Sequence, residues 1–213
     1  MAGARTVECG MALYGLTGSI GAGKSTVARM FSEMGIPVAD ADALGRKLLA
    51  SPGEVADRLK AVVPGCVGSN GGIDRGVLAS VIFENERIRR EVELLLHAEI
   101  WRMVQQWLGG LPRGRPALIE GAVLLESPLG LASGLCGIVM VVAPGELRFE
   151  RVLSRGDIDP EQFRLREAAQ LAQSEKLCRA DFVIDNSADP ASTRRQVEYV
   201  AGCILREWGG ELQ

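Results

Sequence analysis

A glycine-rich segment near the start of the chain limits the possible folds more than any other feature. The segment, GLTGSIGAGKST from Gly15 to Thr26, follows the apolar run MALYGL and opens a helical pattern that Gly35 closes. Within it, Gly18 to Ser25 satisfies the pattern G-x-x-x-x-G-K-[ST] in full. Such a turn between strand and helix offers backbone N–H groups and a positive helix end to one anion. The segment therefore predicts a phosphate-binding loop in an α/β fold.

Short apolar runs alternate with longer helical patterns along the rest of the chain. The candidate strands lie at 11–17, 36–40, 116–121, 137–143 and 181–185. The candidate helices lie at 24–34, 85–108, 145–155, 160–176 and 190–208, with a short one after Asp42. Asn85 is the candidate N-cap of the helix at 85–108. Most of the strands are apolar on successive residues, which is typical of strands covered on both faces. The alternation predicts a P-loop NTPase-type three-layer fold, with a five-stranded parallel sheet flanked by helices.

One interval interrupts this alternation. From about 43 to 110 the sequence contains only helical patterns and a glycine-rich turn, GSNGG at 68–72. We expect this interval to form a helical lobe within a single domain of residues 11–213, and a helical lid at about 145–176. Residues 1–10 lack the apolar stretch of a secretion signal, and we expect them to be an extra, disordered segment.

The composition limits the classes of partner. A net charge of −3 gives no electrostatic support for nucleic-acid binding, although 20 of the 24 basic residues are arginines, which suit phosphate oxygens. No apolar run approaches the roughly 18 residues that span a bilayer. The five cysteines show no C-x-x-C spacing and are expected to be reduced, buried apolar residues of a cytoplasmic protein. A monomer is the simplest expectation for the oligomeric state.

The loop residues have distinct expected roles. Gly18, Gly21 and Gly23 let the backbone approach phosphate oxygens without a Cβ in the way. Lys24 is expected to reach the β- and γ-phosphates of a nucleoside triphosphate, and Ser25 to offer its hydroxyl to Mg²⁺. The pattern is strong for a nucleotide such as ATP and does not say what is done with it.

Acidic side chains follow two of the predicted strands. Asp40 and Asp42 lie at the end of the second strand, in VADAD, where ligands of open α/β sheets collect. Asp42 is a candidate base for a hydroxyl that attacks the γ-phosphate, but the residues alone leave open a helix N-cap before Ala43. Glu120, after the third strand, is a candidate for holding Mg²⁺ through water or an ordinary surface glutamate.

Basic side chains in the predicted lid and lobe complete the candidate set. Arginines at 148, 151, 155, 164 and 166 flank a Gly-Asp turn at 156–157. A helix–turn–helix flap with such arginines can close over a triphosphate, although nearby acids equally favour a solvated face. His97 lies beside the apolar stripe of the long helix, with packing as its default role, and Arg75 follows the candidate N-cap Asp74.

Taken together, these segments resemble the dephospho-coenzyme A kinase family over about residues 13–200. LTGSIGAGKSTVA is similar to the family's opening loop, and GIPVADAD to its second-strand signature. GGIDRGVLASVIFEN with LLLHAEI resembles the stretch G-x-L-D-R-x-x-L…F…H-P-x-I, and EGAVLLE resembles D-x-P-L-L-x-E. RVLSRGD, RLREAAQ and RADFVIDN are similar to the family's lid and final strand.

The resemblance implies transfer of the ATP γ-phosphate to the ribose 3′-hydroxyl of dephospho-coenzyme A, with Mg²⁺. By matching positions, Asp42 corresponds to the proposed catalytic base and Arg151 and Arg155 to lid positions. The triphosphate loop corresponds to Gly21, Ala22, Gly23, Lys24, Ser25 and Thr26. Asn186 ends the strand that leads into the adenine loop, so the resemblance implies a nucleotide contact for it. Positions lining the acceptor and metal region correspond to Thr17, Arg75, His97 and Glu120, beside the acid Asp40.

The chain departs from the family pattern at a few positions. Ala98 replaces the proline after the histidine, Glu120 replaces an aspartate, Gly121-Ala122 replaces x-Pro, and Arg148 stands where a glutamine is common. A nucleoside monophosphate or shikimate-type kinase would share the fold and loop. A GTP-binding switch would need a guanine-reading N-K-x-D, which the sequence lacks although DALG at 42–45 fits D-x-x-G.

Overall fold

The computed structural model describes residues 12–50, 52–68, 71–126, 134–156 and 158–209. The expectations for residues 1–10 and for Asp157 of the predicted turn therefore lie outside the described residues. The chain divides into two compact units. Unit 1 combines the described residues of Met1–Asp40 and Gly110–Gln213, and unit 2 is Ala41–Gly109.

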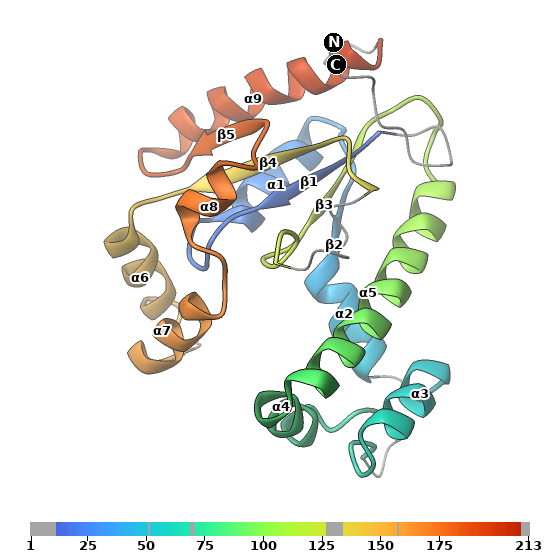
Figure 1. The fold of residues 1–213 in the computed structure, drawn as a ribbon. Coiled ribbons are helices and arrows are strands. Elements are labelled where there is room, and N and C mark those ends of the chain that lie inside the picture. The colour runs from blue at the N-terminus through green and yellow to red at the C-terminus, as the bar shows by residue number, and fades with distance from the viewer. Residues whose placement is uncertain (1–11, 51, 69–70, 127–133, 157, 210–213) are drawn as a thin grey trace. The chain divides into compact units, whose positions relative to one another are not determined.

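Unit 1 contains a parallel sheet in the order β2-β3-β1-β4-β5 (Figure 1). The strands are β1 (Leu13–Thr17), β2 (Val38–Asp40), β3 (Ala117–Glu120), β4 (Gly137–Val142) and β5 (Phe182–Asp185). Each lies within one of the five predicted strands. The fold class expected from the sequence, a five-stranded parallel sheet flanked by helices, is confirmed.

Alternate side chains of β1 pack on opposite faces of the sheet. Tyr14 and Leu16 belong to a core that includes Phe31 and Val197, from helices α1 (Lys24–Glu33) and α9 (Pro190–Glu207). Gly15 faces the other side, where an added Cβ would lie 2.7 Å from Leu135 Cδ1. All five residues of β1 are buried, as expected for a strand covered on both faces.

The predicted helix at 160–176 is wrong as a single element. The structure contains α6 (Gly145–Leu153), α7 (Pro160–Ala168) and α8 (Gln173–Leu177), with a break between the last two. At the break, the Leu171 N–H donates to Glu126 Oε1 at 3.2 Å, and Ala172 has an extended ψ of 146°. Helical periodicity continues through this stretch, but tertiary hydrogen bonds turn the backbone aside.

Unit 2 is helical, as predicted, apart from one isolated antiparallel bridge between Val67 and Ile73. Its helices are α2 (Ala41–Ala50), α3 (Glu54–Val62), α4 (Arg75–Glu84) and α5 (Glu86–Gly109). The N-caps expected at Asp74 and Asn85 are confirmed: Asp74 Oδ1 accepts from the Gly76 N–H at 2.9 Å, and Asn85 Oδ1 from the Ile88 N–H at 3.1 Å. Leu59 and Val92 lie in a core of this unit's own.

Two expectations drawn from the composition can be compared with the structure. The four described cysteines are free, but only Cys66 of these is buried: Cys136 and Cys203 are partly exposed and Cys178 is exposed. The expectation that the cysteines are buried is therefore confirmed for Cys66 and wrong for Cys178. Among the described helices, none is both long enough and apolar enough to cross a membrane.

Candidate functional site

The glycine-rich loop between β1 and α1 is shaped by backbone that other residues rarely adopt. Gly21 and Gly23 have φ of 80° and 91°, in the left-handed region. The loop leads directly into α1, whose first residue is Lys24, and the Lys24 Nζ donates to the Gly18 carbonyl at 3.1 Å. The ammonium group thus lies folded over the loop, at the positive end of the helix. This is a geometry that binds phosphate.

Asn186 supports the loop from the end of β5. Its Nδ2 donates to the Ala22 carbonyl at 2.8 Å, and its Oδ1 accepts from Thr193 Oγ1 at 2.9 Å. A Cβ added at Gly23 would lie 2.1 Å from Asn186 Nδ2. The sequence suggested a nucleotide contact for Asn186. Its buried side chain binds the loop itself, so the structure gives it a supporting contact.

A pocket of about 350 Å³ adjoins the loop on the side of Asn186. Its lining includes Gly23, Thr26, Arg151 and Arg155. The Arg151 Nη2 donates to the Asn186 carbonyl at 2.9 Å, whereas its Nη1 is buried without a hydrogen-bond partner. Such an orphaned donor is costly unless a ligand or water completes it. Unit 1 therefore brings both lid arginines of the candidate set beside the loop.

The carboxyl ends of three strands place polar groups next to α1. Ser25 Oγ donates to Glu120 Oε1 at 3.3 Å, and Glu120 is in register with Asp40 of β2. The buried Thr17 hydroxyl donates to the Gly121 carbonyl at 2.9 Å. Within the described residues, no group of three His, Cys, Asp or Glu side chains is placed to hold a metal ion. A cation here would depend on a hydroxyl, water or ligand oxygens besides the carboxylates.

The other candidate residues belong to unit 2. Asp42 is exposed in the first turn of α2, which begins at Ala41, so the alternative of an N-cap before Ala43 is wrong. Arg75 is exposed at the start of α4. His97 is half-buried in α5, and its Nδ1 is buried without a partner. Burial lowers the pKa of His97, with the charge of Glu93 acting in the opposite direction.

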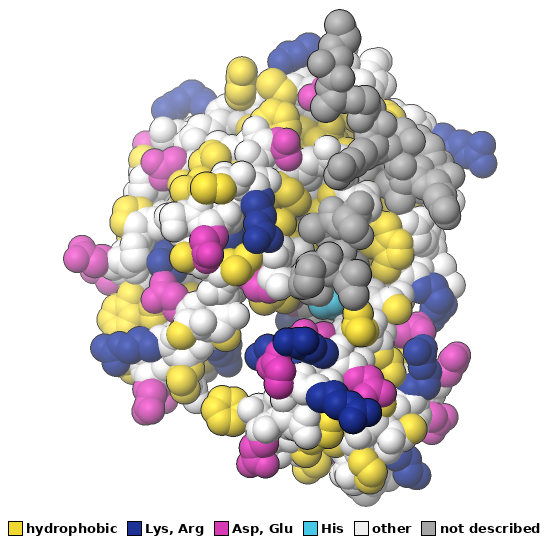
Figure 2. All heavy atoms as spheres, in the orientation of Figure 1, with side chains coloured by type: hydrophobic (Ala, Val, Ile, Leu, Met, Phe, Trp, Pro, Cys, Tyr) yellow, Lys and Arg dark blue, Asp and Glu magenta, His cyan; other side chains and the backbone are white. Residues whose placement is uncertain are grey.

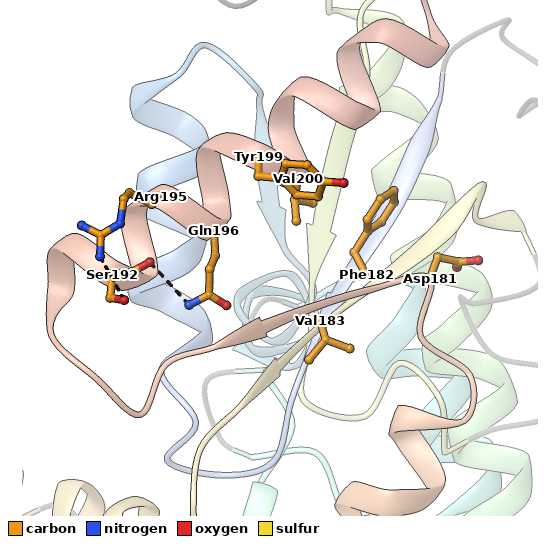
Figure 3. Close-up of a pocket in the computed structure, with 8 residues that line it drawn as sticks. All are labelled: Asp181, Phe182, Val183, Ser192, Arg195, Gln196, Tyr199 and Val200. Carbon is orange, nitrogen blue, oxygen red and sulfur yellow. Dashed lines mark hydrogen bonds between the residues drawn. The ribbon is translucent and has the colours of Figure 1, made fainter.

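A separate pocket of about 670 Å³ lies where β5 and α9 meet (Figure 3). Its lining includes Phe182, Val183 and Tyr199, and it shares no residue with the loop. The Gln196 amide at its wall donates to the Asp185 and Ser192 carbonyls at 2.8 and 3.4 Å. Nothing in this pocket combines an unpartnered buried polar group with an anion-binding backbone. The candidate site is therefore the loop.

Charged side chains of both signs are interspersed over the face seen in Figure 2. Several arginines pair with glutamates on their own helix, such as Arg89 with Glu86 at 2.7 Å and Arg102 with Glu99 at 2.9 Å. These pairs are partly exposed and each contributes little to stability.

Comparison with known proteins decides among the kinases that share this loop. Residues 12–191 match the dephospho-CoA kinase family. The chain belongs to the dephospho-CoA kinase family. The Geobacillus kaustophilus dephospho-CoA kinase is 35% identical over 198 residues, which cover 91% of this chain and 95% of the relative. The crystal structure of TT1252 from Thermus thermophilus is 32% identical with a TM-score of 0.78, covering 89% of this chain and 96% of that one.

The dephospho-CoA kinase from Campylobacter jejuni has the same fold, with a TM-score of 0.62 at 24% identity over 88% of this chain and 94% of that one. Membership of the dephospho-CoA kinase family sets aside the shikimate-type, nucleoside monophosphate and GTP-switch alternatives that the loop alone left open.

Sequence reasoning missed two residues that contact the loop. Arg148 was grouped with the lid arginines, but it is buried and its Nη1 donates to the Ile20 carbonyl at 3.2 Å. Gln170 was given no role, yet its Oε1 accepts from the Ile20 N–H at 3.0 Å. These contacts join positions 128 and 150 residues apart, and no local pattern signals them.

Proposed function

We propose that this protein catalyses transfer of the ATP γ-phosphate to the ribose 3′-hydroxyl of dephospho-coenzyme A, giving coenzyme A and ADP. Membership of the dephospho-CoA kinase family supports the reaction. The observation that carries it is the loop itself. The Lys24 side chain lies over the loop, and the backbone at Gly21 and Gly23 has a conformation that residues other than glycine rarely adopt. The remaining residues are assigned by how they fit this reaction.

The nucleotide is proposed to lie across the loop and the adjoining pocket. The N–H groups at the start of α1 and the Lys24 ammonium neutralise the β- and γ-phosphates. Arg151 and Arg155 line the pocket, and the buried Arg151 Nη1 is a hydrogen-bond donor without an acceptor. A ligand oxygen or ring nitrogen there would complete it. Gly18, Ala22 and Thr26 contribute backbone and hydroxyl groups around the same phosphates, and Asn186 holds the loop in shape.

Mg²⁺ is proposed at Ser25 and Glu120. The two side-chain oxygens lie 3.3 Å apart, and Asp40 is in register with Glu120, so the donors are the hard oxygen atoms that this ion prefers. Water or phosphate oxygens would fill the remaining coordination positions of the ion, which is usual for Mg²⁺. When bound, the ion would neutralise charge on the β- and γ-phosphate oxygens.

Asp42 is proposed as the base. The bond that forms joins the ribose 3′-oxygen to the γ-phosphorus, and the bond that breaks joins this phosphorus to the oxygen that stays on ADP. The hydroxyl proton passes to the Asp42 carboxylate, which is exposed at the start of α2. Thr17, Arg75 and His97 are proposed to contact the acceptor, with Arg75 facing its anionic groups.

We further propose a single kinase domain, active in the cytoplasm as a monomer, in which unit 2 is an insertion between β2 and β3. Residues at about 43–110 form its acceptor lobe and residues at about 145–176 its lid. Two features support the single domain: unit 2 begins and ends at neighbouring strands, and the nucleotide loop lies entirely in unit 1.

A coupled assay of ADP release tests the reaction. The purified protein is given ATP, Mg²⁺ and one acceptor at a time: dephospho-coenzyme A, a nucleoside monophosphate or shikimate. Turnover with dephospho-coenzyme A alone, and phosphate on the 3′-oxygen of the product, is the expected result. Strong turnover with another acceptor and none with dephospho-coenzyme A rejects the proposal.

A further inference from the structure

The backbone of Ile20, inside the glycine-rich loop, is held by two side chains, one from α6 and one from the stretch between α7 and α8. Its N–H donates to Gln170 Oε1 at 3.0 Å. Its carbonyl accepts from Arg148 Nη1 at 3.2 Å. The N–H belongs to the peptide between Ser19 and Ile20, and the carbonyl belongs to the peptide between Ile20 and Gly21. Residues distant in sequence therefore fix the orientation of two successive loop peptides.

Arg148 is itself held in place. It is buried in α6, and its Nε donates to the Ala143 carbonyl at 3.2 Å. Its Nη2 pairs with Glu167 of α7 at 2.7 Å. A Cβ added at Gly21 would lie 2.4 Å from the Arg148 carbonyl oxygen, so the loop backbone lies directly against α6. One guanidinium group thus joins the loop to both α6 and α7.

Gln170 is anchored at its other end. Its Nε2 donates to the Ala122 carbonyl at 3.5 Å, a long bond, and Lys176 Nζ donates to the same carbonyl at 2.9 Å. Lys176 is fully buried and pairs with Glu126 Oε1 at 2.6 Å. The segment that breaks the helix between α7 and α8 is thereby fixed to the residues that follow β3, and it places Gln170 against the loop.

We infer that Arg148 and Gln170 are positioning residues for the nucleotide: they orient the two peptides that flank Ile20, and through them the remaining N–H groups of the loop. Because Gln170 occupies the Ile20 N–H, that group is not offered to phosphate, and its contribution is to the loop's shape. A loop held in its binding conformation before the nucleotide arrives loses less entropy on binding. The inference rests on the proposed function, since it takes the loop's ligand to be ATP.

The test measures affinity for a fluorescent ATP analogue by direct titration, without any acceptor. Gln170→Met keeps the length of the side chain and removes the acceptor oxygen. The matched control, Gln162→Met, makes the same change at an exposed position of α7. We expect affinity to fall about tenfold in Gln170→Met, the order of one lost hydrogen bond, and to stay within about twofold of wild type in the control.

Two further variants separate positioning from general damage. Gln170→Glu keeps an oxygen that accepts the Ile20 N–H, and we expect it to restore affinity to within about threefold of wild type. Arg148→Lys keeps the charge but loses the planar fork, and we expect affinity for the ATP analogue to be about fivefold weaker. This variant tests the contact with the Ile20 carbonyl if Gln170→Met does not fold. In all folded variants the affinity for dephospho-coenzyme A, measured alone, should stay at the wild-type value.

Equal affinity in Gln170→Met and Gln162→Met would overturn the inference. So would a parallel loss of affinity for both substrates together with a lower melting temperature, because that pattern indicates loosening of the whole unit. Failure of the proposed function has a different signature: the wild-type protein would bind the ATP analogue without transferring phosphate to dephospho-coenzyme A.

Discussion

The Asn186 side chain and the Ala22 carbonyl are joined by a hydrogen bond of 2.8 Å across 164 positions of sequence. Gly23 follows immediately with a φ of 91°, and a Cβ added there would lie 2.1 Å from Asn186 Nδ2, so a side chain at this position would strain the backbone and displace Asn186. The end of β5 therefore sets the shape of a loop that begins at β1. Asn186 thus supports the loop and also lines the pocket beside it.

Gly23→Ala tests this relationship. We expect it to weaken binding of a fluorescent ATP analogue by at least about tenfold, because the Cβ must displace Asn186 and strain the backbone. Gly35→Ala is the matched control: φ there is 77°, but nothing lies within 4 Å of the added Cβ. It should cost about 1 kcal/mol of folding free energy and leave affinity unchanged. Equal losses of affinity in the two variants would contradict the steric explanation.

Lys24→Met is expected to lower turnover by about 10²–10³-fold, because the ammonium group neutralises charge on the transferring phosphoryl group. Steady-state ADP release measures the effect. Lys60→Met, at an exposed position of α3, serves as the control and should retain wild-type turnover. A Lys24→Met protein with turnover near wild type would remove Lys24 from the reaction.

Asp42→Asn is expected to lower turnover while leaving the affinity for ATP nearly unchanged, because the amide cannot accept the hydroxyl proton. Asp57→Asn makes the same change in the first turn of α3, so it has a similar effect on a helix dipole without a proposed role in the reaction. Turnover is measured by single-turnover kinetics at saturating substrates. Equal effects of the two changes would reduce Asp42 to a helix-stabilising residue.

The buried pair of Lys176 and Glu126 provides a stability prediction. Lys176→Met leaves the Glu126 carboxylate, whose side chain is 17% exposed, without its cation, and we expect a loss of about 3–5 kcal/mol in the free energy of unfolding. The double variant Lys176→Met/Glu126→Gln removes the unpaired charge and keeps an oxygen for the Leu171 N–H, so it should be more stable than Lys176→Met alone. Urea denaturation of the wild type, both single variants and the double variant measures the coupling. Strictly additive losses would show that the two charges do not interact.

His97 gives stability a pH dependence. Burial lowers the pKa of the folded imidazole below its unfolded value of about 6.5, so the unfolded chain takes up the proton first as the pH falls. The stabilising contribution is therefore complete above about pH 6.5 and decreases as the pH falls through the folded pKa. Between about pH 7.5 and 5.5, the melting temperature should fall less in His97→Gln than in wild type. Equal decreases of the melting temperature in wild type and His97→Gln would show that groups other than His97 cause the pH dependence.

The sequence predicted those parts of the fold that local patterns encode. The loop, all five strands and the caps at Asp74 and Asn85 depend on spacing within a few residues, and each is confirmed. The break between α7 and α8 was missed because it depends on Glu126, which is remote in sequence. Helix propensity favours continuation there, and tertiary hydrogen bonding overrides it.

The candidate site shows the same division between residues that local sequence patterns predict and contacts that only the folded chain makes. Residues within the loop follow a known spacing, whereas the burial of Arg148 and the contact from Gln170 arise only when α6 and the segment after α7 fold against Ile20. The roles of Asp42, Arg75 and His97 stay predictions. Asp42 was proposed from its place after the second strand and from the family resemblance, and Arg75 and His97 mainly from the resemblance. No contact in unit 2 tests these roles.

Unit 2 fills the connection between β2 and β3, which are adjacent parallel strands and would need only one crossover helix. Most of Ala41–Gly109 is therefore not needed to connect these two strands, and it has a core of its own. With the acceptor assigned to unit 2 as we propose, changes within Ala41–Gly109 could alter the choice of acceptor while the glycine-rich loop of unit 1 keeps its sequence. Redesign of acceptor specificity would then begin in unit 2.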